Sequence, residues 1–150
     1  MAIATPAGIF RLTGKADRID RLACGGLAII DYKTGRMPNE TAVQAGLAPQ
    51  LPLEAAIAEA GGFAAFAPAP VVTLEYWNLR GNGSDCQQSI KAVEELADRA
   101  LDRLRGLIET FDDPKTPYLS RPRPHLAPPY SDYEHLARVK EWALGEEAGE

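Results

Sequence analysis

Two neighbouring stretches of sequence decide the fold: GKADRID at residues 14–20 and LAIIDYKTG at residues 27–35. Between them lies CGG at residues 24–26. A Gly-Gly pair between two strand-like runs is typical of a β-hairpin turn. Residues 27–30 are all apolar, which indicates a central strand buried on both faces. This run ends at Asp31, so we expect polar side chains at the place where a buried strand ends.

The sequence around this hairpin predicts an α/β domain. Alternating apolar and polar residues over 9–22 predict one strand covered on one face. A loop is expected over 34–39, a helix over 49–60 and a strand over 71–79. A long amphipathic helix is predicted over 88–109, where apolar residues recur at helical spacing. The order strand, strand, helix, strand, helix is that of a layered α/β domain.

The two ends of the chain carry weaker signals. Residues 111–130 are proline-rich and are expected to be extended, followed by a short helix over 131–142 and a frayed acidic tail over 145–150. A length of 150 residues is that of a single domain. The chain opens directly into a strand, so we expect that the first helix of the fold is missing. The chain would then be a C-terminal fragment of a larger protein.

Composition excludes several classes of protein. Hydrophobic residues make up 45% and charged residues 25%, as in soluble globular domains, and no apolar run is long enough for a membrane span. The N-terminus lacks the pattern of a signal peptide, and the two cysteines fit no paired metal or redox spacing. These observations favour a cytoplasmic protein with free thiols. The net charge is −5, but residues 1–40 carry six basic and four acidic residues, so the predicted hairpin lies in the basic part of the chain.

Asp17, Asp31 and Lys33 are the candidate functional residues. Each strand of the hairpin carries one carboxylate, and Lys33 shares a strand face with Asp31 because side chains alternate. Mg²⁺ prefers oxygen ligands and usually keeps several waters, so two carboxylates and the backbone carbonyl of Tyr32 can hold it. Lys33 can then orient an attacking water or offset negative charge at a phosphate. The alternative is that Asp17 is a solvated hairpin residue and Lys33 a surface ion-pair partner.

These motifs together resemble the PD-(D/E)XK nuclease superfamily, in its RecB-like branch. The resemblance rests on the pattern G-x-x-D at residues 14–17, the hairpin, DYKT at 31–34 and QLPLE at 50–54. Within that branch, the chain most resembles the C-terminal nuclease domain of the AddB subunit of AddAB helicase–nucleases, including its segment 120–124. The resemblance implies a restriction-endonuclease-like fold, with a mixed central β-sheet flanked by helices. It also implies an exonuclease that cleaves DNA with Mg²⁺, or Mn²⁺, during double-strand-break repair and recombination.

Carried onto this chain, the resemblance assigns a role to each motif residue. Asp17 and Asp31 would bind the metal, Lys33 would be the catalytic lysine, and Gln50 would match a glutamine that lies near the active site of the branch. Asp20 is a rival for the first acid, although the G-x-x-D pattern favours Asp17. The implied partners are DNA, as a single strand or a duplex end, and an AddA-like helicase–nuclease subunit.

The chain departs from the family pattern in two ways. Cys24 and Cys86 are too few for the four-cysteine iron–sulfur cluster of many AddB-type domains, so no cluster is predicted. Residues 1–16 contain no Asp, Glu or His, whereas the branch carries such a ligand before its first strand. An alternative function is therefore a catalytically incomplete nuclease-like module that docks DNA or a helicase partner. As an isolated fragment, the chain is also expected to be capable of self-association.

Overall fold

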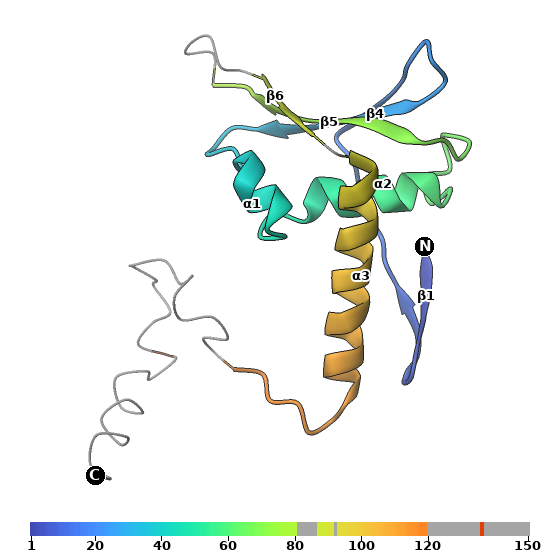
Figure 1. Ribbon diagram of the computed structural model, residues 1–150, viewed down its shortest axis with the longest axis vertical. Coiled ribbons are helices and arrows are strands. Elements are labelled where there is room, and N and C mark those ends of the chain that lie inside the picture. The colour runs from blue at the N-terminus through green and yellow to red at the C-terminus, as the bar shows by residue number, and fades with distance from the viewer. Residues whose placement is uncertain (81–86, 92, 120–135, 137–150) are drawn as a thin grey trace. The chain divides into compact units, whose positions relative to one another are not determined.

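The computed structural model of the chain describes residues 1–80, 87–91, 93–119 and 136 (Figure 1). The chain divides into two compact units, Met1–Asp113 and Pro114–Glu150. The helices and strands of the described residues all belong to the first unit. In the second unit, residues 114–119 form neither helix nor strand. The helix predicted over 131–142 lies outside the described residues except for residue 136, and the tail over 145–150 lies outside them entirely.

Four strands form the central sheet, in the spatial order β3, β4, β5, β6. They span Arg18–Arg21, Leu27–Lys33, Val71–Asn78 and Gln87–Ile90. β3 and β4 are antiparallel, β4 and β5 are parallel, and β5 and β6 are antiparallel. The sheet is therefore mixed and is accompanied by helices, as a restriction-endonuclease-like α/β fold requires. The predicted fold class is confirmed.

The β3–β4 hairpin forms where the Gly-Gly pair predicted it. Gly25 has a φ of +87°, a left-handed conformation that glycine adopts without the steric cost of a Cβ atom. Leu22 N donates a hydrogen bond to Gly26 O at 2.9 Å, which closes the turn. The turn sets a register that pairs Arg18 with Ile30, so the end of β4 lies just beyond the start of β3.

Three helices accompany the sheet: α1 (Glu40–Gln44), α2 (Gln50–Glu59) and α3 (Val93–Asp112). Figure 1 shows α1 and α2 on the same side of the sheet, and α2 lies in the crossover that joins the parallel strands β4 and β5. Alternate residues of these strands meet the helices in one apolar core. Its fully or nearly fully buried members include Leu27, Ile29, Leu74 and Tyr76 of the sheet and Leu51, Ala55, Leu96 and Ala97 of α2 and α3.

The prediction of a single strand over residues 9–22 is wrong. β2 (Gly8–Arg11) pairs with β1 (Ala2–Thr5) in a separate two-stranded sheet, and the central sheet begins only with β3. Between β2 and β3, Gly14 passes so close to α2 that an added Cβ would lie 3.0 Å from Ile57 Cδ1. The chain follows the surface of the helix there and does not pair with β4, although its apolar and polar residues continue to alternate.

The predicted start of the long helix is also wrong. α3 begins at Val93, while Gln87–Ile90 form the edge strand β6. Pairing with β5 gives one edge of this segment its backbone hydrogen bonds and buries Ile90, whose apolar side chain fits a helical spacing equally well. Along the described part of the chain, α3 included, no helix has both the length and the apolar character needed to cross a membrane.

Helix α1 was not predicted, and it is a short element with a clear cap. The Asn39 side chain accepts a hydrogen bond from Ala42 N at 2.8 Å, as a helix N-cap does. The predicted extended segment over 111–130 begins later than expected, because α3 continues to Asp112. The part of that segment after residue 119 lies outside the described residues.

Leu74 and Val72 offer a test of the core within one strand. Leu74 has no exposed surface, whereas Val72 is 48% exposed. Leu74→Ala should lower the free energy of unfolding by about 3 kcal/mol, because it removes buried methyl groups and leaves a cavity. Val72→Ala should lower it by less than about 1 kcal/mol. Urea unfolding followed by circular dichroism measures both, and equal losses would contradict this placement of the core.

Candidate active site

Strand β4 carries two functional side chains on the face that meets the helices. Asp31 and Lys33 follow Leu27 and Ile29 on that face at alternate positions, so the strand changes from apolar to charged as it ends. Asp31 is only 2% exposed. Its Oδ2 lies 2.6 Å from Lys33 Nζ, and this ion pair offsets the charge of a nearly buried carboxylate.

Gln50 joins these two residues from the first turn of α2. Its Nε2 donates a hydrogen bond to Asp31 Oδ1 at 2.6 Å, and its Oε1 accepts one from Lys33 Nζ at 3.1 Å. The next two residues of the helix, Leu51 and Pro52, are fully buried and fix this end of α2 against the sheet. Asp31, Lys33 and Gln50, which are separated by up to 19 positions in the sequence, therefore form one connected cluster.

Asp17 approaches the same end of β4 from the chain before β3. Its Oδ2 accepts a hydrogen bond from Tyr32 N at 2.9 Å, between the two charged residues of β4. Asp20, the rival first acid, makes an ion pair with Arg18 at 2.7 Å. The structure thus places Asp17 beside the cluster. The roles of Asp17 as a metal ligand and of the Tyr32 carbonyl as a third ligand stay predictions.

Glu54 also belongs to the cluster, and sequence reasoning gave it no role. It lies one helical turn after Gln50, is 5% exposed, and its Oε1 accepts a hydrogen bond from Gln50 Nε2 at 3.3 Å. Burial raises the pKa of the Glu54 carboxyl, and the negative charges of Asp31 and Asp17 raise it further, while Gln50 and Lys33 oppose this shift. The signal in the sequence was its spacing, since residues i and i+4 of a helix share a face.

Tyr76 of β5 is a second member that sequence reasoning missed. Its side chain is fully buried, and Lys33 Nζ lies 5.7 Å from the centre of its ring. Burial, followed by the charges of Asp31 and Glu54, raises the pKa of the Tyr76 hydroxyl to about 12. The hydroxyl is therefore a neutral group beside two carboxylates. Its position in a strand rich in apolar residues made it indistinguishable from an ordinary core aromatic.

The cluster fits a divalent cation with oxygen ligands. Three buried side-chain atoms of the described residues have no hydrogen-bond partner: Asp31 Oδ2, Glu54 Oε2 and Tyr76 OH. All three lie in this cluster, where Asp31 Oδ2 has only its ion pair with Lys33. Within the described residues, no three Asp, Glu, His or Cys side chains come close enough together to form a full metal cage. The unpartnered carboxylate oxygen of Asp31 is of the type that Mg²⁺ prefers, and this ion needs only one or two carboxylates because it keeps several waters.

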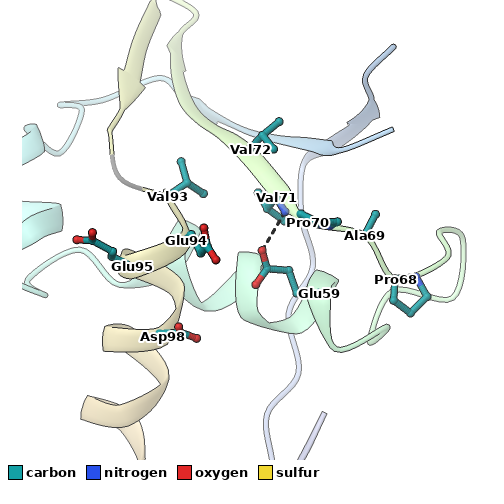
Figure 2. A pocket seen from close by; sticks show the side chains of 10 residues that line it. All are labelled: Glu59, Pro68, Ala69, Pro70, Val71, Val72, Val93, Glu94, Glu95 and Asp98. Carbon is teal, nitrogen blue, oxygen red and sulfur yellow. Dashed lines mark hydrogen bonds between the residues drawn. The ribbon is translucent and has the colours of Figure 1, made fainter. Parts of the chain in front are cut away.

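A large pocket elsewhere in the first unit does not contain this cluster. Figure 2 shows this hollow, of about 870 Å³, between the start of β5 and the helices α2 and α3. Glu59, Glu94, Glu95 and Asp98 contribute to its wall, and no lysine or arginine is among the described residues that line it. Because carboxylates repel phosphates, it does not suit a nucleic-acid backbone. It also lies at the opposite end of the parallel strands from Asp31, since Val71 pairs with Leu27.

The fold and the cluster together define a class of protein, nucleases built on a mixed α/β sheet. A sequence model of the PD-(D/E)XK nuclease superfamily matches residues 2–124, and the chain belongs to this superfamily. Membership implies a nuclease-type hydrolase, and nucleases of the superfamily generally use divalent metals. The resemblance of the sequence to the PD-(D/E)XK superfamily is therefore confirmed, at the level of the superfamily.

Two curated relatives match a shorter part of the chain. Uncharacterized proteins of Rickettsia conorii and Rickettsia felis are each 38% identical to it over 53 residues. The match covers 35% of this chain and 6% of each relative, so this chain matches a small part of much longer proteins. No solved structure matches the chain.

The raised pKa of Glu54 predicts how stability depends on pH. A carboxyl whose pKa is higher in the folded state than its ordinary value of 4.5 stabilises the fold below that value, and this contribution is lost as the pH rises through the folded pKa. A glutamine at position 54 cannot ionise, so Glu54→Gln should gain stability relative to the natural protein as the pH rises from about 4 to about 7. Unfolding of both proteins in urea across this range measures the difference. If the free energies of unfolding of the two proteins differ by the same amount at every pH, the raised pKa of Glu54 is contradicted.

Proposed function

We propose that this chain is a Mg²⁺-dependent deoxyribonuclease domain that removes nucleotides from a DNA strand. The observation that carries the proposal is the convergence of Asp31, Lys33 and Gln50 at the carboxyl end of β4. These residues come from two separate elements, and their chain belongs to a superfamily of nucleases. A structural ion pair alone would not need a glutamine amide that contacts both of its members.

Asp17 and Asp31 are the proposed ligands of Mg²⁺, for which Mn²⁺ can substitute, and the Tyr32 carbonyl is the proposed third ligand. When bound, the cation supplies Lewis acidity toward the scissile phosphate. Lys33 holds a positive charge beside the Asp31 carboxylate, where it can orient water or offset charge that develops on the phosphate. Gln50 contacts both charged groups and thereby keeps Lys33 and Asp31 at a fixed separation.

The proposed setting is the repair of double-strand breaks by recombination. The motifs at residues 14–17, 31–34 and 50–54 support an AddB-like domain, with an AddA-like helicase–nuclease as partner and the cytoplasm as location. The low share of each Rickettsia protein that is matched supports a domain that works within a larger protein. We propose no iron–sulfur cluster, because the two cysteines of the sequence are too few to hold one.

A second candidate function is a nuclease-like module that docks DNA or a partner without cutting. The ion pair of Lys33 with Asp31 favours it, because the ammonium lies 2.6 Å from an oxygen that the cation would use. Calorimetry separates the two functions. A catalytic site should bind Mg²⁺ or Mn²⁺ with an affinity that Asp17→Ala abolishes, whereas a docking module should give the same result with and without this substitution.

Substitution of Asp31 or Lys33 should strongly slow the cleavage of single-stranded DNA in the presence of Mg²⁺. Asp31→Asn and Lys33→Met should each lower the rate by about a hundredfold or more, because each removes a charge at the reacting phosphate or its cation. Asp20→Asn is the matched control, since this carboxylate pairs with Arg18 outside the cluster, and it should change the rate less than about threefold. Release of acid-soluble nucleotides measures the rate. Absence of cleavage by the natural sequence, also in a polypeptide extended at its N-terminus, would refute the proposal.

A further inference from the structure

The side chain of Gln50 is held from three directions, and the three contacts are not equivalent. Asp31 and Lys33 are the residues that would engage the cation and the phosphate under the proposed function, so each of them must also meet a partner other than Gln50. The third contact is with Glu54, which has neither of these roles. Glu54 is therefore the one member of the cluster that can keep hold of Gln50 while its other two partners interact with substrate.

Chemistry fixes the orientation of the Gln50 amide. The ammonium of Lys33 can only donate hydrogen bonds, so the amide oxygen must face it. The carboxyl oxygens of Asp31 and Glu54 accept hydrogen bonds here, so the amide NH₂ faces Asp31 at 2.6 Å and Glu54 at 3.3 Å. Both N–H groups of Gln50 are thus used. Without Glu54, one of them would have no acceptor in the cluster.

The position of Glu54 is itself restrained. The residue is 5% exposed and lies on α2 among buried apolar neighbours. A Cβ at Gly14 would lie 3.6 Å from Glu54 Cγ, so the chain before β3 passes over the stem of this side chain. Burial of a carboxylate with one unpartnered oxygen, Oε2, costs stability that an apolar residue at this position would not lose. A function that needs the carboxylate explains why such a residue occupies this position.

We propose that Glu54 is a positioning residue, which anchors the amide of Gln50 so that its oxygen stays directed at Lys33. This inference rests on the proposed nuclease function. Glu54 touches neither substrate nor cation in this arrangement and acts through Gln50. Residues that orient a group in an active site typically contribute about 10- to 100-fold to activity, which is the size of effect expected here.

A double-mutant cycle tests the action of Glu54 through Gln50. Glu54→Leu should lower kcat for single-stranded DNA about 10- to 100-fold with little change in KM, and Glu54→Gln should restore most of the loss because its amide oxygen can accept the same hydrogen bond. In a Gln50→Leu background, Glu54→Leu should have less than about a twofold further effect. If the double variant instead loses the full product of the two single losses in kcat, Glu54 and Gln50 act independently, and the proposal is overturned.

A measurement on the metal-free protein separates this inference from the nuclease function. The side-chain amide signals of Gln50, identified by their loss in Gln50→Leu, should exchange with water at least about tenfold faster in Glu54→Leu than in the natural protein. Glu54→Gln should retain slow exchange. Glu59→Leu is the matched control, because it removes a carboxylate from the same helix that bonds Val71 N instead, and it should leave these signals unchanged.

Failure of the nuclease function and failure of the positioning role would give different results. Faster exchange in Glu54→Leu, in a protein without Mg²⁺-dependent cleavage, would refute the nuclease function and support the positioning role. Cleavage by the natural protein with unchanged exchange in Glu54→Leu would overturn the positioning role and leave the nuclease function intact. Thermal unfolding of each variant shows whether it is folded, and Glu54→Ala, which also removes the acceptor, takes the place of Glu54→Leu if that variant is not.

Discussion

The site depends on one constraint, the burial of an ionised carboxylate at the end of a central strand. Asp31 is 2% exposed, and an isolated charge in such a place would be strongly destabilising. Its two oxygens are matched by the ammonium of Lys33 and the amide of Gln50. These partners can reach it only if β4 ends where it does and α2 begins directly beneath it. The geometry of strand, crossover and helix is therefore a condition for the contacts that compensate the burial of Asp31.

The sequence predicted most of the scaffold that meets this condition, because the signals concerned are local. The Gly-Gly turn, the apolar run of β4 and the β-branched residues of β5 each identify an element by themselves. The errors fall where local pattern is ambiguous. Ile90 suits an edge strand as well as a helix, and the alternation before Asp17 continues through a segment where Gly14 lies against α2. Only tertiary contacts decide between those alternatives.

The candidate site also contains residues that the sequence could predict and residues that it could not. Alternation along a strand brings Asp31 and Lys33 to one face, so their proximity could be predicted from the sequence. A place for Gln50 near the active site was implied only by a family resemblance, because nothing in the sequence says which end of α2 meets β4; its contacts with both residues come from the structure. Glu54 and Tyr76 were missed because a buried acid and a buried tyrosine are recognised by their surroundings. Their unpartnered oxygens appear only once the sheet and α2 are packed together.

The charge of the cluster and the charge of the whole chain both affect how a phosphate can approach the site. Asp17 and Asp31 face one ammonium at the end of β4, that of Lys33, so acidic side chains outnumber basic ones in the cluster, and the whole chain carries a net charge of −5. A phosphate approaching such a cluster is repelled unless a cation lies between them. Under the proposed function, cation binding is thus a precondition for contact with DNA and not only for its cleavage. An acidic domain of this kind gains little affinity from the phosphate backbone by itself. Under the proposed function, it is therefore suited to a strand that a partner delivers.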